Sequence, residues 1–221
     1  MSERQNPGVI DTATNPEARE RAQESVNALR ELISSPNVST GRNTRVIEER
    51  VDVVGPDGQP DTRRERLNPE DDERQQVQAR VETEQGYYPV TISFPENQDP
   101  PTEFRVSIEL SADAAVVNTG NFALAGAMEA GFSRFEAVRL RDFTFDSEAG
   151  STSVTEQDFT RLSGSRTLRP KLGGRPDSHD MTSTEAGELM AMLGKAKLGE
   201  NGDGQTVEAL IPNWDKLVAG E

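Results

Sequence analysis

The chain contains a single histidine, His179, which lies between acidic residues in the segment Asp177-Ser178-His179-Asp180. Zinc and iron sites generally need at least two imidazole or thiolate ligands, and the chain has no cysteine. A serine hydrolase is also disfavoured, because the Gly-x-Ser-x-Gly turn that exposes such a nucleophile is missing. We therefore expect no metal centre and interpret His179 as an exposed loop residue.

Two glycine-containing segments match ligand-binding loops only in part. Six residues separate Gly187 from Gly194-Lys195 where a phosphate-binding loop has four, and Ala196 replaces its Ser or Thr. Residues 200–205 lack the sixth-position glycine and the final glutamate of a calcium loop. We therefore expect no cofactor, no small-molecule substrate and no enzymatic activity.

The charge composition is the strongest signal in the sequence. Asp and Glu number 39 against 24 Lys and Arg, and only four of those bases are lysine, which leaves a net charge of −15. Such a charge opposes a compact state in dilute buffer, whereas at about 1 M salt the Debye length falls to about 3 Å and the repulsion largely disappears. Carboxylates with arginine in place of lysine are typical of proteins that fold in near-saturated brine. The sequence therefore predicts a haloarchaeal or haloarchaeal-virus protein made in a high-salt cytoplasm.

The N-terminal region is predicted to be a mobile arm followed by one helix. Residues 1–14 are polar, and Asn15-Pro16-Glu17 places a capping residue, a proline and an acid in the order that favours a helix start. Apolar residues then recur at helical spacing to about residue 34. Two alternatives remain open: this stripe packs on its own domain, or it docks on a neighbouring subunit. The subunit-contact candidates are Ala22, Val26, Leu29 and Ile33.

The rest of the chain, residues 44–221, is predicted to be a β domain. Apolar residues alternate in several short segments, which favours half-buried strands. In Phe135–Phe145 the parity shifts between Leu140 and Phe143, and a bulge near Arg141-Asp142 would restore a single apolar face. The expected strands are 44–54, 62–67, 88–94, 104–110, 135–145, 152–162, 167–169 and 206–211.

Short helices and one ambiguous segment interrupt these strands. A helix is expected over residues 121–130, and the capping box Thr182-Ser183-Thr184-Glu185 opens another to Leu193. Residues 68–84 fit either a helix or an edge strand, so the charged segment 44–86 is predicted to be an insertion, an added sheet or a small subdomain. Short strands, inserted helices and many Gly and Pro turns favour an antiparallel sandwich, and specifically a single jelly roll.

The order of elements from about residue 91 to 210 resembles a viral single jelly-roll capsid protein. The features that carry it are the early strand Phe104–Leu110, a short helix ending at Phe132, the long strand Phe135–Phe145, and the helix before residues 206–211. With the brine composition, this is similar to the small major capsid proteins of haloarchaeal viruses that enclose an internal membrane. The resemblance implies self-association and contact with other capsid proteins, no catalysis, and a place in the virion near that membrane.

Two other functions remain open. A carbohydrate-binding or surface-binding jelly roll needs exposed aromatics, of which Tyr87, Tyr88 and Trp214 are the non-phenylalanine candidates. A tail, connector or head-decoration protein of a haloarchaeal tailed virus is the third candidate. Direct contact with nucleic acid is not expected, because the acidic excess extends along the chain and no basic face is evident.

The charge analysis makes a first prediction about stability. The thermal unfolding midpoint should be higher in about 1 M KCl than in about 0.05 M KCl, because salt screens the repulsion among carboxylates. Circular dichroism during heating measures it. A midpoint that stays constant or falls with salt would contradict the prediction.

Overall fold

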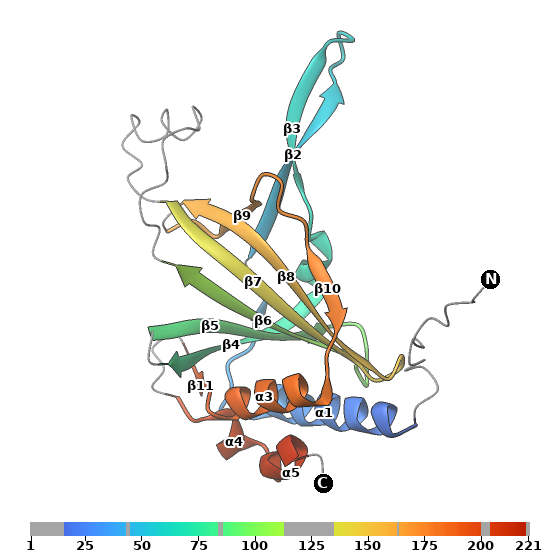
Figure 1. Ribbon diagram of the computed structural model, residues 1–221, viewed down its shortest axis with the longest axis vertical. Helices are drawn as coiled ribbons and strands as arrows, with labels where there is room; N and C mark the ends of the chain where they lie inside the picture. The colour runs from blue at the N-terminus through green and yellow to red at the C-terminus, as the bar shows by residue number, and fades with distance from the viewer. Residues whose placement is uncertain are drawn as a thin grey trace, which may run out of the picture.

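The computed structural model describes residues 16–42, 45–83, 86–112, 135–162, 164–199 and 204–219, and these residues are mainly β (Figure 1). The strands are β1 (Gly41–Arg42), β2 (Val46–Val54), β3 (Pro60–Arg66), β4 (Arg74–Thr83), β5 (Gly86–Pro95), β6 (Glu103–Ala112), β7 (Phe135–Asp146), β8 (Ser151–Leu162), β9 (Thr167–Pro170), β10 (Asp177–Asp180) and β11 (Lys197–Leu198). The helices are α1 (Pro16–Ser34), the 3-10 helix η2 (Pro69–Glu73), α3 (Ser183–Gly194), α4 (Val207–Leu210) and α5 (Trp214–Ala219).

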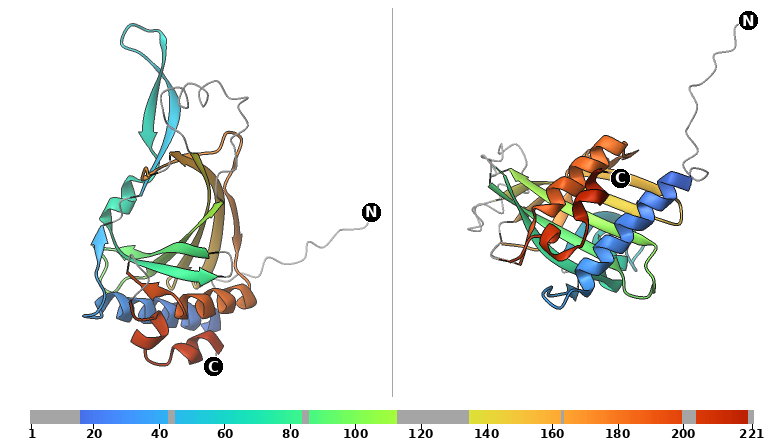
Figure 2. Two further views of the ribbon diagram at one scale, coloured as in Figure 1. Left: turned by 90° about the vertical axis from the view of Figure 1, so that its left-hand side faces the viewer. Right: turned by 90° about the horizontal axis from the view of Figure 1, so that it is seen from below.

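The strands form one 11-stranded sheet in the order β1-β4-β5-β6-β7-β8-β9-β2-β3, with β10 on β8 and β11 on β4. Figure 2 shows that this sheet curls strongly and that α1 and α3 lie across its outer face. The prediction of a mainly β fold is confirmed, but the jelly roll is not. Neighbours follow chain order from β4 to β9, whereas a jelly roll distributes two Greek keys over two facing sheets.

The two faces of the curved sheet differ in chemistry. On the outer face, one cross-strand row runs Val77, Ile92, Val106, Phe143 and Val154, and all five side chains are buried. On the inner face, the adjacent row is wholly polar: it runs Gln76, Ser93, Arg105, Thr144 and Ser153. The helices cover the apolar row of the outer face.

Strand β7 contains no bulge, so the prediction of one near Arg141-Asp142 is wrong. Its pairing with β6 and β8 keeps a constant register over the whole strand. The parity shift instead reflects two separate apolar clusters on opposite faces. Phe143 and Phe145 belong to the core under the helices, whereas Val138 and Leu140 pack inside the curve with Phe159, Leu168 and Ile47.

Helix α1 begins and ends where its sequence predicts, and it packs on its own sheet. The four subunit-contact candidates are 6% exposed or less: Ala22, Val26, Leu29 and Ile33. The apolar stripe therefore follows the first of the two alternatives and covers the chain's own core. The surface that α1 offers to a neighbour is its opposite, charged side.

The C-terminal region differs most from its prediction. The capping box at Thr182 and Glu185 is present at the start of α3, as expected. Residues 206–211, expected as a strand, instead contain α4, with Thr206 at its N-cap position. The tryptophan of the tail, Trp214, is only 3% exposed, and its indole N–H donates to the Met190 carbonyl at 3.1 Å.

The segment 44–86 does not form a sheet of its own among the described residues. Its ambiguous part contains η2 followed by β4, which pairs with β5 over ten residues within the main sheet. Strands β2 and β3 form a hairpin that projects from the body (Figures 1 and 2). His179 is exposed, as expected, but it lies in β10 and not in a loop. The expected arm 1–14 and helix 121–130 lie outside the described residues.

The packing of Trp214 predicts opposite effects for two glycines of α3. A Cβ on Gly194 would lie 2.3 Å from the Trp214 Nε1, whereas one on Gly187 meets nothing closer than 3.7 Å. We expect Gly194→Ala to lower the free energy of unfolding by about 1–3 kcal/mol through overpacking. Gly187→Ala, the matched control, should be neutral or stabilise by up to about 1 kcal/mol, because alanine favours helix.

Urea unfolding at high salt, followed by tryptophan fluorescence, measures both changes. Equal effects at the two positions would show that Trp214 does not pack against α3 in this way.

Candidate functional site

A polar network lies inside the curve of the sheet, where the strands bring charged residues from distant parts of the chain together. Asp71 of η2 is the central carboxylate, with a side chain that is only 6% exposed. It lies 3.7 Å from Arg45 and 3.6 Å from Arg105 of β6, and it accepts a hydrogen bond from Asn68 at 2.7 Å. The Asn68 side chain also accepts the backbone N–H of Ile47 at 2.8 Å, which fixes η2 to the start of β2.

Arg74 extends this network along β4. It donates to the Glu103 carboxylate at 2.8 Å and to the backbone carbonyl of Ser93 at 3.0 Å. Burial lowers the pKa of the Arg74 guanidinium, and the nearby positive charge of Arg105 lowers it further, while Glu103 and Asp71 raise it. The bidentate geometry of arginine suits such carboxylate partners better than lysine does.

The network borders a cavity of about 250 Å³ whose lining residues are all polar or charged: Arg45, Asp71, Ser93, Arg105, Ser107, Asp142, Thr144 and Thr155. Three guanidinium groups of the network (Arg45, Arg74, Arg105) face three carboxylates (Asp71, Glu103, Asp142), so the charges balance. Ser107 donates a hydrogen bond to Asp142, but no histidine lies beside this pair to act as a base. We interpret the network as a structural support that holds the curl of the sheet.

His179 lies on the opposite face of the sheet from this network. It pairs with Val154, whose side chain belongs to the outer face, and its own side chain is 51% exposed. Its Nε2 lies 3.7 Å from Glu185, whose pKa is lowered chiefly by the backbone N–H of Thr182 in the capping box. Among the described residues no group of three or more His, Cys, Asp and Glu is placed to hold a metal ion.

The projecting hairpin, which we call the ribbon (β2 and β3), is partly to fully exposed along both strands. Its strands pair from Glu48 with Arg66 to Val54 with Pro60, whereas β2 meets β9 only at Val46 and Ile47. Val54 at its far end is 76% exposed. An isolated two-stranded hairpin is marginally stable in water, and its free edges can accept another strand. The charges on β3 discourage indiscriminate pairing, so a partner must be complementary.

A basic segment lies beside the base of the ribbon, and sequence reasoning missed it. Residues 159–176 contain five bases and no acid, although the chain as a whole is strongly acidic. One of the five, Arg161, is paired with Glu109 and Glu136. The other four are exposed and, in the part of the chain that the structure describes, take part in no ion pair: Arg166, Arg169, Lys171 and Arg175. The signal that could have identified them is the absence of any acidic residue between Asp158 and Asp177.

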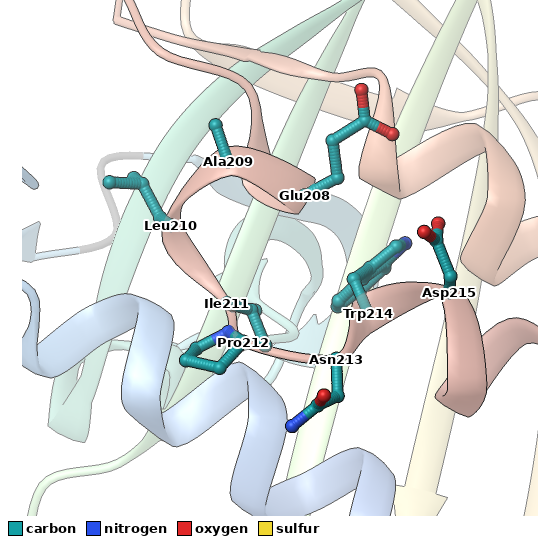
Figure 3. A pocket seen from close by; sticks show the side chains of 8 residues that line it. All are labelled: Glu208, Ala209, Leu210, Ile211, Pro212, Asn213, Trp214 and Asp215. Carbon is teal, nitrogen blue, oxygen red and sulfur yellow. The ribbon is translucent and has the colours of Figure 1, made fainter.

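A hollow of about 480 Å³ lies at the opposite end of the body, in the segment between α4 and α5. We call it the C-terminal pocket; its lining residues are Glu208, Ala209, Leu210, Ile211, Pro212, Asn213, Trp214 and Asp215. Figure 3 shows the carboxylates of Glu208 and Asp215 at one side of the pocket and the side chains of Leu210 and Pro212 at the other. Ile211 and Trp214 form a buried apolar floor.

Comparison of the chain with protein-family models, with curated proteins and with solved structures gave no match. No helix in the described ranges is both long and apolar enough to cross a membrane. The function is therefore argued from the geometry alone.

The inner network predicts unequal roles for two adjacent acids. Asp71→Asn should lower the free energy of unfolding by about 1–3 kcal/mol, because it removes the buried carboxylate that the partly buried Arg45 and Arg105 share. Asp72→Asn is the control: its side chain is 52% exposed, and the loss of its pair with Arg66 should cost less than about 1 kcal/mol. Urea unfolding of both variants tests this, and a smaller loss for Asp71 than for Asp72 would contradict the assigned roles.

Proposed function

We propose that this chain is a structural virion protein of a halophilic archaeal virus, which assembles with copies of itself into a shell. The observation that carries the proposal is the ribbon, a charged two-stranded projection that the described part of the chain leaves uncovered. A structure with such an element gains stability when a neighbour covers it, because the hairpin then no longer stands alone in water.

The surface chemistry supports assembly in brine. The excess of carboxylates keeps single copies apart in dilute buffer, and molar salt screens that repulsion. Salt also strengthens the burial of apolar surface, so contacts between copies become more favourable at high salt. The proposal does not require a jelly roll, because it depends on the exposed ribbon and the acidic surface and not on the strand order.

The alternative of a carbohydrate-binding module has less support. Trp214, its main candidate, is buried, and Tyr88 is partly buried against the core, which leaves Tyr87 at 57% exposure. A tail, connector or decoration protein belongs to the same assembling class as a shell protein, and the symmetry of the assembly would distinguish them.

Shortening the ribbon tests the proposal. Residues 50–64 can be replaced by Asn-Gly, because Glu49 and Glu65 lie opposite each other in the hairpin. The Asn-Gly sequence favours the two-residue turn that would join them. We expect the full chain to form multimers in about 1 M KCl and the shortened chain to remain monomeric. Light scattering after size-exclusion chromatography measures both masses.

An unchanged circular dichroism spectrum and unfolding midpoint serve as the control that the shortened chain still folds. If the full chain stays monomeric at every salt concentration, the proposed function is wrong. If the shortened chain assembles as well as the full chain, the ribbon is not the contact.

A further inference from the structure

The exposed turn that follows β9 combines positive charge with the most exposed large apolar side chain among the described residues. Leu172 is 90% exposed and is followed at short range by Arg175 and preceded by Lys171. The Gly174 N–H donates to the Lys171 carbonyl at 2.8 Å, and Gly173 has a φ of 78°, which suits the third position of a tight turn. The backbone thus holds Leu172 at the tip of a turn, between two cations.

The C-terminal pocket has the complementary features. Glu208 and Asp215 are exposed at its side and take part in no ion pair among the residues that the structure describes. Leu210 is partly exposed and Pro212 is exposed at the other side of the pocket, so an aliphatic side chain would meet these two residues. Two carboxylates facing Leu210 and Pro212 fit an aliphatic side chain flanked by a lysine and an arginine.

The turn and the pocket lie at opposite ends of the body. Figure 1 shows the connection between β9 and β10 near the base of the ribbon, and α4 and α5 at the far end beside the C-terminus. A chain therefore cannot insert its own turn into its own pocket. Outside the basic segment, residues 159–176, the chain holds all 39 acidic residues and 19 of the 24 bases. A second copy therefore offers the turn a surface of opposite charge.

We propose that the turn at Lys171–Gly174 of one copy docks in the C-terminal pocket of the next copy. Leu172 packs against Leu210 and Pro212, while Lys171 and Arg175 pair with Glu208 and Asp215. This inference rests on the proposed function and adds a second contact to that of the ribbon, and assembly requires both. Because the two surfaces differ, the contact is head-to-tail and repeats into a ring or a filament, and does not close as a two-fold dimer. The apolar insertion strengthens with salt, and the charges fix the orientation.

A charge exchange between two variants tests the contact. The first variant carries Lys171→Glu and Arg175→Glu, and the second carries Glu208→Lys and Asp215→Lys. At the lowest KCl concentration at which the unaltered chain forms multimers, each alone should associate about tenfold or more weakly than that chain, because like charges then face each other and are screened least. An equimolar mixture should recover association, since each turn again meets a pocket of opposite charge. Analytical ultracentrifugation measures all three samples.

The matched control carries Arg166→Glu and Arg169→Glu, which change the net charge of the basic segment equally but lie outside the turn. It should associate like the unaltered chain. If the first and second variants also associate normally while the unaltered chain forms multimers, this contact is wrong and the proposed function stands. If the unaltered chain does not form multimers in any salt, the proposed function fails as well.

Nucleic acid is the other ligand that an acid-free basic segment can bind. Binding of a random-sequence DNA duplex, measured by fluorescence anisotropy over a range of salt, decides between the two. Duplex binding that is lost with Lys171→Glu and Arg175→Glu, together with unchanged association of that variant, would overturn the inference.

Discussion

The alternation of side chains across β4 to β8 is the constraint on which the rest of the structure depends. It places apolar residues such as Ile92 and Val106 on one face and polar residues such as Ser93 and Arg105 on the other. The apolar face is covered by α1, α3 and the C-terminal helices. The second face curls around the polar network and a small apolar cluster at Leu140. The described residues leave the outer end of the β2–β3 ribbon and the turn after β9 without cover.

The inner face shows how an arginine-rich, acidic chain supports its curl. The carboxylate of Asp71 lies between Arg45 and Arg105, and Glu103 contacts both Arg74 and Arg105. Removing one member of such a network is costly, because a partner charge is then left buried and uncompensated. The charges of this interior balance each other. On the surface, by contrast, the cations of the turn after β9 lie at one end of the body and the carboxylates of the C-terminal pocket lie at the other. This separation of unlike charges to opposite ends is the basis of the contact that we propose between copies.

Local elements were predictable from the sequence, and their arrangement was not. Helix α1, the ribbon and the Thr182–Glu185 capping box follow from spacing and capping chemistry that act within a few residues. Alternation in β5 and β6 reveals that one face is buried, but helices and a second sheet cover such a face equally well, so the alternation could not decide for a jelly roll, which the strand order does not confirm. The tail around Trp214 was missed because its apolar residues pack against α3, a contact that no local pattern encodes. The basic segment was missed because the acidic excess of the whole chain conceals an acid-free stretch between Asp158 and Asp177.

Electron microscopy of the full chain in multi-molar KCl tests the central claim most directly. The account predicts ordered multimers in which the end that carries the turn after β9 meets the α4–α5 end of a neighbour, with the ribbon in contact with another copy. A uniform field of single copies at high salt, or multimers joined only through the outer side of α1, would contradict it.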